Sequence, residues 1–247
     1  MTTSRMNLFW LIVFAATMPV AVIVSTQLAR RSFEKVRIRE QTITVKGYAE
    51  QPITSDRAIW RATIVERNPD RTAAYASLEE GRRKLLAYLD RYGISETEVE
   101  FGPVTITAEH RRNEDGYTTN EIELYRLGQR FQIEGDDVQR IATIAREAGS
   151  LIGEGVELQA ESPSYLYTKL ESMKLEMLSQ ATANARERAE RLVDGSGNGI
   201  GDLRSANQGV FQITPAYSTE VSGSGYNDTS SIAKSIKAVV TVEYAVE

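Results

Sequence analysis

The chain of 247 residues contains no cysteine and only one histidine, His110. The absence of cysteine excludes disulfides but leaves the cellular compartment open, because an exported protein need not carry them. A single histidine cannot build a metal site of the usual kind, and a catalytic role for it needs a nucleophile or an orienting acid that no motif displays. We therefore expect His110 to be a satisfied residue near the end of a strand.

Positive charge is also scarce. The whole chain carries a net charge of −5, and because residues 1–31 contain three arginines and no acid, residues 32–247 carry −8. Binding of nucleic acid depends on basic side chains that neutralise phosphates, so we predict no nucleic-acid partner. The acidic part of the chain is long enough to bury a core in one domain or in two small ones.

Charge is missing altogether from the run Leu8–Leu28, which extends over 21 residues. A helix of this length spans roughly 30 Å, the thickness of the hydrocarbon core of a bilayer. The run is too long for the apolar part of a cleavable signal peptide, and no suitable cleavage site ends it. We interpret it as an uncleaved, single-pass anchor in the lipid bilayer, with a cleaved signal peptide as the weaker alternative. A tail at 1–7 precedes the anchor and a juxtamembrane linker at 29–40 follows it.

The basic residues on either side of this run favour a cytoplasmic position for the globular part. Only Arg5 precedes the run, whereas Arg30, Arg31 and three further basic residues up to position 39 follow it. An excess of lysine and arginine marks the cytoplasmic side, although long translocated domains often override this bias. Taken alone, the charges place the globular part inside the cell.

The remaining sequence alternates between strand and helix patterns. Period-two alternation predicts strands at 43–47, 58–64, 104–108, 121–134 (with a bulge near 126–128), 156–160, 210–213 and 236–246. Helical spacing predicts helices at 70–93, 136–149 and 167–193, and a loop rich in serine and glycine covers 214–235. The buried side of the last helix is expected to carry Leu170, Met177, Ala181, Ala185 and Leu192. The predicted fold class is α+β, with antiparallel β-sheets and helices packed on one face.

Several segments resemble a known family. They are ITVKGYAEQPITSDRAIW (43–60), SPSYLY (162–167), ARERA (185–189), QGVFQITP (208–215) and the closing strand. On these segments the chain resembles the SIMPL-domain family of bacterial envelope proteins. The resemblance implies a domain over 41–247 built of two subdomains, the inner one at about 99–161. It also implies an extracytoplasmic position and a homo-oligomer, since some members assemble into large closed oligomers. The family has no established activity, so no functional residue is carried over.

The resemblance and the flanking charges disagree about orientation. We follow the resemblance and predict a protein of the cell (inner) membrane whose globular domain is extracytoplasmic, because the charge rule is only a bias.

One pattern resembles a calcium loop. Asp194, Ser196, Asn198 and Asp202 take its positions 1, 3, 5 and 9, but position 12 is Ser205 instead of the bidentate glutamate. We therefore expect a glycine-rich helix stop, with calcium as the weaker alternative, and predict no cofactor.

Two further patterns suggest chemistry. Ser231 and Lys234 have the Ser-x-x-Lys spacing of penicillin-binding enzymes, but no accompanying motif is present, so we expect solvated loop residues. A set of aromatic residues flanks turns and is expected to finish the edge of a core, with anchoring of a partner or ligand as the alternative. This aromatic set is Tyr165, Tyr167, Phe211 and Tyr217.

Three classes of function remain. The first is a membrane-anchored, non-catalytic envelope protein that acts as a structural or oligomeric assembly module. The second is a ligand-sensing domain that uses a cleft between subdomains, with the loop 214–235 as its lid. The third and weakest is a hydrolase built on Ser231 and Lys234 or on carboxylates.

Overall fold

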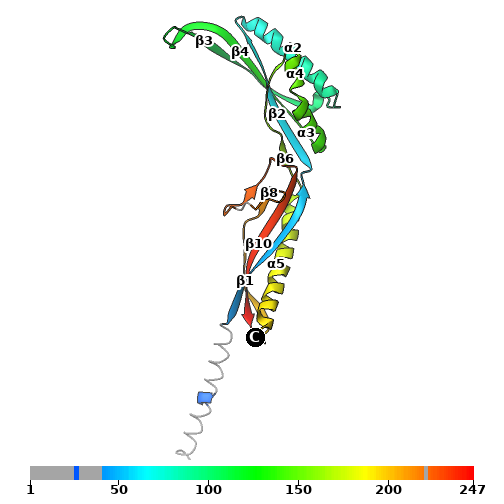
Figure 1. The fold of residues 1–247 in the computed structure, drawn as a ribbon, viewed down its shortest axis with the longest axis vertical. Coiled ribbons are helices and arrows are strands. Elements are labelled where there is room, and N and C mark those ends of the chain that lie inside the picture. Colours follow the sequence, from blue (N-terminus) through cyan, green and yellow to red (C-terminus); the bar gives the residue numbers. More distant parts are fainter. Residues whose placement is uncertain (1–24, 28–40, 220–221) are drawn as a thin grey trace, which may run out of the picture. The chain divides into compact units, whose positions relative to one another are not determined.

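The computed structural model describes residues 25–27, 41–219 and 222–247 (Figure 1). The predicted anchor, Leu8–Leu28, lies outside the described residues except for Ser25–Gln27, which are helical. The tail at 1–7 and the linker at 29–40 lie outside them as well. No helix within the described ranges is long and apolar enough to cross a membrane.

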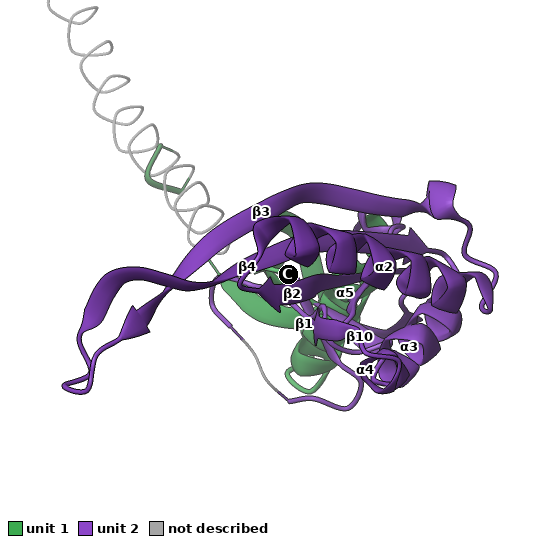
Figure 2. Cartoon of the chain, turned by 90° about the horizontal axis from the view of Figure 1, so that it is seen from above, with its two compact units in different colours: residues 1–49, 175–210, 238–247 green, residues 50–174, 211–237 purple. Residues whose placement is uncertain are grey.

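The chain divides into two compact units, which Figure 2 shows in different colours. The first comprises Met1–Ala49, Leu175–Val210 and Ala238–Glu247, and the second comprises Glu50–Lys174 and Phe211–Lys237. The range 99–161, expected as the inner subdomain, lies within the second unit.

The first unit is a sheet covered by one long helix. Its elements come from β1 (Thr42–Thr54), α5 (Leu170–Asp194), β7 (Ile200–Gln208) and β10 (Ala233–Val246). Strand β10 lies between β1 and β7 and pairs antiparallel with β7, from Val240 opposite Gln208 to Val246 opposite Ile200. Strand β7 was not predicted, since the glycines before it indicated only a loop.

Helix α5 approaches β1 closely at Gly47. A Cβ atom at this position would overlap the carbonyl oxygen of Ala181 and lie 2.7 Å from the Cβ of Ala185. The backbone amide of Tyr48 donates a hydrogen bond to Asn184 Oδ1 at 3.1 Å, beside the same contact. The alanines of α5 and the glycine of β1 therefore act together, because only small residues allow this distance.

The buried side of α5 differs in part from the prediction. Met177, Ala181 and Ala185 are buried as expected, but the stripe continues through Ala189 and Val193. Leu192 is 64% exposed, so its predicted place in the core is wrong. A stripe with a spacing of four residues reaches 189 and 193 and leaves position 192 one step around the helix.

The second unit contains a separate antiparallel sheet. Its strands are β2 (Arg57–Asn68), β3 (Val99–Arg112), β4 (Thr118–Gly135), β5 (Glu157–Ala160) and β6 (Ser164–Leu166). The strand order is β3-β4-β2-β5, and β6 also pairs with β2. The helices of this unit are α2 (Arg71–Asp90), the 3₁₀ helix η1 (Glu96–Glu98), α3 (Val138–Glu147) and α4 (Ser150–Gly153). The order β2-α2-β3-β4-α3-β5, with β4 between β2 and β3, is the split β-α-β arrangement of ferredoxin-like folds.

The core of this unit lies between the sheet and its helices. Alternate residues of β2 and β4 are buried together with the inner faces of α2, α3 and α4. The largest of them include Trp60, Leu78, Leu85, Phe131 and Ile141. Figure 1 shows that the helices stand beside the part of the sheet nearest β2, whereas the far part of the β3–β4 hairpin extends past them.

Local signals set the boundaries of these helices. The Asp70 carboxylate accepts hydrogen bonds from the amides of Thr72 and Ala73 at 2.7 and 2.8 Å, which caps α2 at the predicted start of this helix. The cap of α3 is Asp137, which accepts from the amide of Arg140 at 3.0 Å, one residue after the predicted start at 136.

The bulge expected near 126–128 is absent. Strand β4 pairs without interruption with β2 from Gly135 to Tyr125. Its irregularity lies further along, where Leu124 is opposite Glu109 but Ile122 is opposite His110. The change in apolar phase is therefore absorbed at residue 123, in the part of the hairpin that no longer contacts β2.

The segment 212–237 belongs to the second unit and contains β8 (Gln212–Pro215), β9 (Tyr226–Asn227) and the start of β10. Strand β10 pairs antiparallel with β8, and β8 pairs parallel with β9. The mixed α+β fold with antiparallel sheets is thus confirmed, while part of the predicted loop at 214–235 is strand.

Candidate functional site

A buried ion pair lies where β10 enters the second unit. Lys234 Nζ is 3.9 Å from Asp228 Oδ2, and both side chains are 1% exposed. The ammonium also donates hydrogen bonds to the carbonyl oxygen of Tyr165, at 2.7 Å, and to that of Asp228 itself. Burial lowers the pKa of the Lys234 ammonium, and the negative charge of Asp228 acts against this effect.

The Asp228 carboxylate is held by the two serines that follow it. One oxygen accepts from the amide and hydroxyl of Ser230 at 2.9 and 2.7 Å, and the other accepts from the amide of Ser231 at 3.2 Å and from its hydroxyl. Burial by itself would raise the pKa of Asp228, but these hydrogen bonds and the charge of Lys234 outweigh it and hold the pKa below its usual value. The carboxylate is therefore ionised and fully bonded.

This geometry corrects the expectation that Ser231 and Lys234 are solvated loop residues. Lys234 is buried on β10, and its ammonium faces two carbonyls and a carboxylate. A charged amine in this position has no lone pair with which to accept a proton from a serine. The geometry supports a structural role for the buried pair of Asp228 and Lys234, called the latch below, and gives no support to a serine–lysine hydrolase.

The latch holds the strand next to it. Tyr165 in β6 receives the Lys234 hydrogen bond on its carbonyl and donates its amide to the carbonyl of Thr229 at 2.8 Å. The amide of Ser55 donates to the carbonyl of Ile232 at 2.9 Å on the other side. The segment 228–234 is thus bonded to β6 and to the turn between β1 and β2.

Strands β5 and β6 follow one another along the same edge of β2, with a break between them. Ala160 is opposite Ala62 and Ser164 is opposite Ile59, and the amide of Glu161 still donates to the carbonyl of Arg61 at 3.0 Å, so the pairing with β2 is interrupted at residues 162 and 163. Pro163 has no amide hydrogen to pair with a strand. The indole N–H of Trp60 donates a hydrogen bond to the carbonyl of Glu161 at 3.0 Å, which holds the chain in place at the break.

A cavity of about 420 Å³ lies between this break and α3. Its walls combine small apolar residues and one aromatic ring with an arginine, a glutamate and a serine. They are formed by Ala142, Ala145, Arg146, Ala160, Glu161, Ser162, Pro163 and Tyr165. The volume lies within the range of small-molecule pockets, and the hollow is open to solvent.

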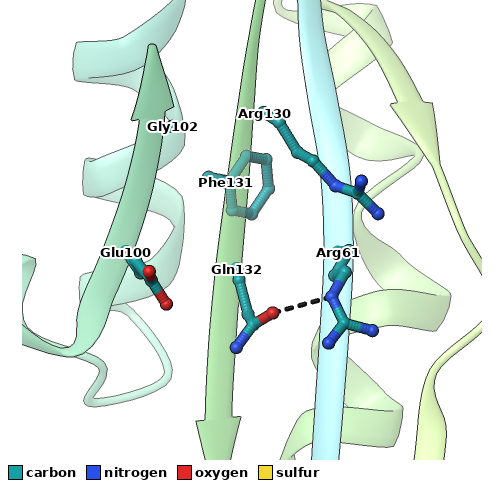
Figure 3. A pocket seen from close by; sticks show the side chains of 6 residues that line it. All are labelled: Arg61, Glu100, Gly102, Arg130, Phe131 and Gln132. Atoms are coloured by element: carbon teal, nitrogen blue, oxygen red, sulfur yellow. Dashed lines mark hydrogen bonds between the residues drawn. The ribbon is translucent and has the colours of Figure 1, made fainter.

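A second hollow, of about 240 Å³, lies on the face of the same sheet that carries no helix (Figure 3). Arg61 Nε donates to Gln132 Oε1 at 2.7 Å across the strands, as the dashed line in Figure 3 shows. Arg130 lies beside it and pairs with Glu161 at 2.6 Å. Both arginines of this hollow are thus engaged, Arg61 with Gln132 and Arg130 with Glu161, so we regard the hollow as part of a cross-strand polar ladder.

Strand β3 forms an edge of the sheet. Within the described ranges its one strand neighbour is β4. Beyond Pro103 the edge carries the uncharged segment Val104–Ala108, where Ile106 is 54% exposed. Tyr117 at the hairpin tip is also exposed. An uncharged, β-branched edge of this kind offers unpaired backbone groups to another strand.

The possible calcium residues lie at the end of α5 and in β7. Asp194 is the last residue of α5, and Asp202 lies in β7. The Ser196 hydroxyl donates to the carbonyl of Val193 at 2.7 Å, and the side-chain amide of Asn198 donates to Ser196 Oγ at 3.2 Å. These local bonds are those of a helix stop. In the part of the chain that the structure describes, no group of three or more His, Asp or Glu residues is placed to hold a metal ion.

His110 is exposed in β3, opposite Ile122 of β4, two residues before the strand ends. The aromatic set does not form one cluster, since no ring contact between any two of its members occurs among the described residues. Tyr165 lines the cavity, Phe211 lies 6.0 Å from the ammonium of Lys174, and Tyr217 is 99% exposed. The expected place at a core edge is therefore wrong for Tyr217. The structure records no contact that brings Tyr167 to the cavity.

The fold and these features define an α+β protein with a split β-α-β sheet and a long exposed hairpin. The chain belongs to the SIMPL family, protein of unknown function (DUF541), which matches residues 43–244. The expected resemblance is confirmed, and the description of the family names no enzymatic activity. No curated protein matches the sequence.

Some solved structures are distantly similar to the chain. An amidase of the hydantoinase/carbamoylase family from Burkholderia phymatum is 15% identical, with a TM-score of 0.29, over 52% of this chain and 34% of that chain. The designed protein Foldit4 is 17% identical, with a TM-score of 0.21, over 44% and 96%. The regulatory subunit of aspartate kinase from Thermus thermophilus is 12% identical, with a TM-score of 0.19, over 79% and 88%. The match spans about a third of the amidase, and none of these scores supports a functional comparison.

Sequence reasoning missed Asp228 and the cavity. A signal for the latch exists, because Lys234 is in phase with Ile236 and Ala238 on the buried face of the last strand. The sequence Asp228-x-Ser-Ser is also typical of a turn in which a carboxylate binds the following amides. The cavity left no such signal, since its alanines come from a helix and a strand whose packing the pattern does not report.

Proposed function

We propose that this protein is a membrane-anchored, non-catalytic envelope protein that acts as an assembly module, in which copies associate through the free edge of β3. The observation that carries the proposal is the segment Val104–Ala108. It is uncharged, rich in β-branched residues and placed on a sheet edge whose backbone groups have no second strand to pair with in the described chain.

The simplest pairing is antiparallel around a two-fold axis at Ile106. In this register Ile106 faces the same residue of the second copy, and Val104 faces Ala108. An isologous contact of this kind is the commonest way in which identical chains associate. Pro103 on one side and the charged residues 109–112 on the other limit the segment that can pair, which favours one register.

The run Leu8–Leu28 supports the rest of the proposal. A bilayer anchor would hold the domains in one plane and raise their effective concentration, so a short edge contact would be enough for association. We place the globular domain outside the cytoplasm, as the family resemblance implies. A reporter fused after Glu247 should then be active only outside the cytoplasm, and a cytoplasmic signal would overturn this orientation.

The assembly role is tested by the mass of the full chain in detergent, measured by sedimentation velocity over a range of concentrations. We expect dimers or larger species for the native chain. Ile106→Lys places like charges opposite each other at the two-fold axis and should shift the population to monomer. The matched control is Ile122→Lys, a similarly exposed residue on β4 of the same hairpin, which should leave the mass unchanged. A native chain that stays monomeric at high concentration would rule the proposal out.

A further inference from the structure

The cavity between α3 and the break after β5 is lined by apolar and polar groups in similar measure. Ala142 and Ala145 form the side on α3, and Pro163 and the ring of Tyr165 form the side on the strands. The alanines leave space that a larger side chain would fill. Its volume of about 420 Å³ lies within the range of small-molecule pockets, roughly 300–1,000 Å³.

Two polar groups converge on this space. The hydroxyl of Tyr165 has no hydrogen-bond partner among the described residues, although burial raises the pKa of this phenol. The Arg146 guanidinium is close enough for its charge to lower that pKa in part. Arg146 itself is held only loosely, 3.4 Å from Glu147 and 3.3 Å from Thr143 Oγ1. Arg146 and Tyr165 therefore bring a cation and a hydroxyl to the lining of the same hollow.

The acidic residue in the wall, Glu161, does not repel an anionic ligand. Glu161 lines the cavity, but its carboxylate pairs with Arg130 at 2.6 Å on the sheet. Its carbonyl is occupied by the indole of Trp60. The charge of Glu161 is thus balanced by Arg130, and its backbone carbonyl is held by Trp60.

The position of Tyr165 is fixed from behind by the buried ion pair. Lys234 holds its carbonyl, and Thr229 accepts its amide hydrogen. The backbone of this wall is consequently fixed before a ligand binds. A pocket whose backbone is already in place loses less entropy when it takes up a ligand of matching shape.

We propose that this cavity binds a small aromatic carboxylic acid, whose ring packs between Tyr165 and the alanines of α3 and whose carboxylate binds Arg146 and the Tyr165 hydroxyl. A guanidinium and a phenol together satisfy a carboxylate, and an aromatic ring packs favourably on a tyrosine face. The same chemistry is offered by a free aromatic acid and by a peptide that ends in phenylalanine.

The test uses the full chain in detergent and ligand-observed NMR. The probes are phenylacetate, its neutral analogue phenylacetamide, and the peptide Gly-Gly-Phe. We expect phenylacetate to bind with a dissociation constant on the order of 0.1–1 mM, as for a ligand of about ten non-hydrogen atoms, and phenylacetamide to bind about tenfold more weakly. Tighter binding of the peptide than of phenylacetate would identify a chain end as the source, and the reverse order a free acid.

Two variants locate the site. Arg146→Gln should weaken phenylacetate about tenfold, whereas Arg83→Gln, an exposed arginine on α2, should change nothing. Ala145→Phe should fill the cavity and abolish binding of all three probes, and Ala76→Phe on the exposed side of α2 is its control. Because Arg146 is exposed, its variant tests the site even if Ala145→Phe fails to fold.

The proposal is overturned if none of the probes binds at 10 mM, or if phenylacetate binds Arg146→Gln as well as it binds the native chain. It goes beyond the assembly role. The variant Ile106→Lys should bind phenylacetate normally, so the two proposals fail separately.

Discussion

The ammonium of Lys234 and the carboxylate of Asp228 lie 3.9 Å apart in the interior of the second unit. Both charged groups are removed from water, which costs solvation free energy. This cost is offset by the hydrogen bonds that Asp228 accepts from Ser230 and Ser231 and by those that the Lys234 ammonium donates to two carbonyls. Since Lys234 also holds Tyr165, the pair joins the segment after β9 to the wall of the cavity.

Asp228→Asn should destabilise the protein strongly. The substitution leaves the Lys234 ammonium buried without a counter-charge, for which the typical loss is about 3–5 kcal/mol of the free energy of unfolding. Urea unfolding of the full chain, followed by circular dichroism, measures the loss. The double variant with Lys234→Met removes both charges and should cost clearly less than the sum of the single changes. Additive losses would show that the two side chains do not interact energetically.

The same pair makes stability depend on pH in the acid range. The pKa of Asp228 in the folded protein lies below its usual value of 3.8, so the unfolded chain binds a proton more readily than the folded one. The contribution of Asp228 is therefore complete above about pH 4 and is lost as the pH falls through the folded pKa. Unfolding measured between pH 7 and pH 2 should show the difference between the native chain and Asp228→Asn shrinking in acid. A constant difference would contradict a lowered pKa.

Gly47→Ala should disrupt the contact between β1 and α5. The added methyl group overlaps the Ala181 carbonyl, which belongs to a helix backbone and cannot move aside cheaply. We expect a loss of about 3 kcal/mol, the upper end for overpacking, in the urea transition of the first unit. Gly153→Ala has nothing within 4 Å of the added atom and should stay within about 0.5 kcal/mol of the native chain. Equal effects of the two substitutions would show that the close approach is not a stability determinant.

The final strand shows how far the sequence alone can predict this fold. Its alternation predicted a strand at 236–246, and Ile236, Ala238, Val240 and Val242 are buried on one face of it, because period two determines which residues share a sheet face. Lys234 lies on the same face but was predicted as a solvated loop residue, since a charge next to an apolar pattern shows its partner only when the chain is folded. The position of Leu192 was wrong because a one-residue shift on a helix changes the exposed side while the composition stays equally apolar. The cavity at Tyr165 depends on how α3 packs beside the break between β5 and β6, which periodicity does not report.

The corrected face of α5 gives a direct comparison between neighbouring residues. Val193→Ala removes two buried methyl groups and should cost about 1–2 kcal/mol. Leu192→Ala removes more apolar atoms but from an exposed site, so its effect should stay within about 0.5 kcal/mol. Urea unfolding of both variants shows whether the burial or the size of the apolar side chain decides the loss of stability. A larger loss of unfolding free energy at position 192 than at 193 would contradict the observed buried face of α5.

The edge of β3 permits a test based on charge exchange. In a two-fold pairing centred on Ile106, the chain Ile106→Lys opposes lysine to lysine and Ile106→Glu opposes glutamate to glutamate, so each variant alone should remain monomeric. A mixture of the two places lysine opposite glutamate and should restore association to heterodimers, visible as a doubled mass in sedimentation velocity. The control mixture of Ile122→Lys and Ile122→Glu should behave like its separate components, because Ile122 lies on β4 and not on the pairing edge. If each Ile106 variant alone associates as the native chain does, the copies meet through another surface. If the mixture stays monomeric while the native chain associates, Ile106 does not lie opposite itself in the contact, which contradicts the two-fold register.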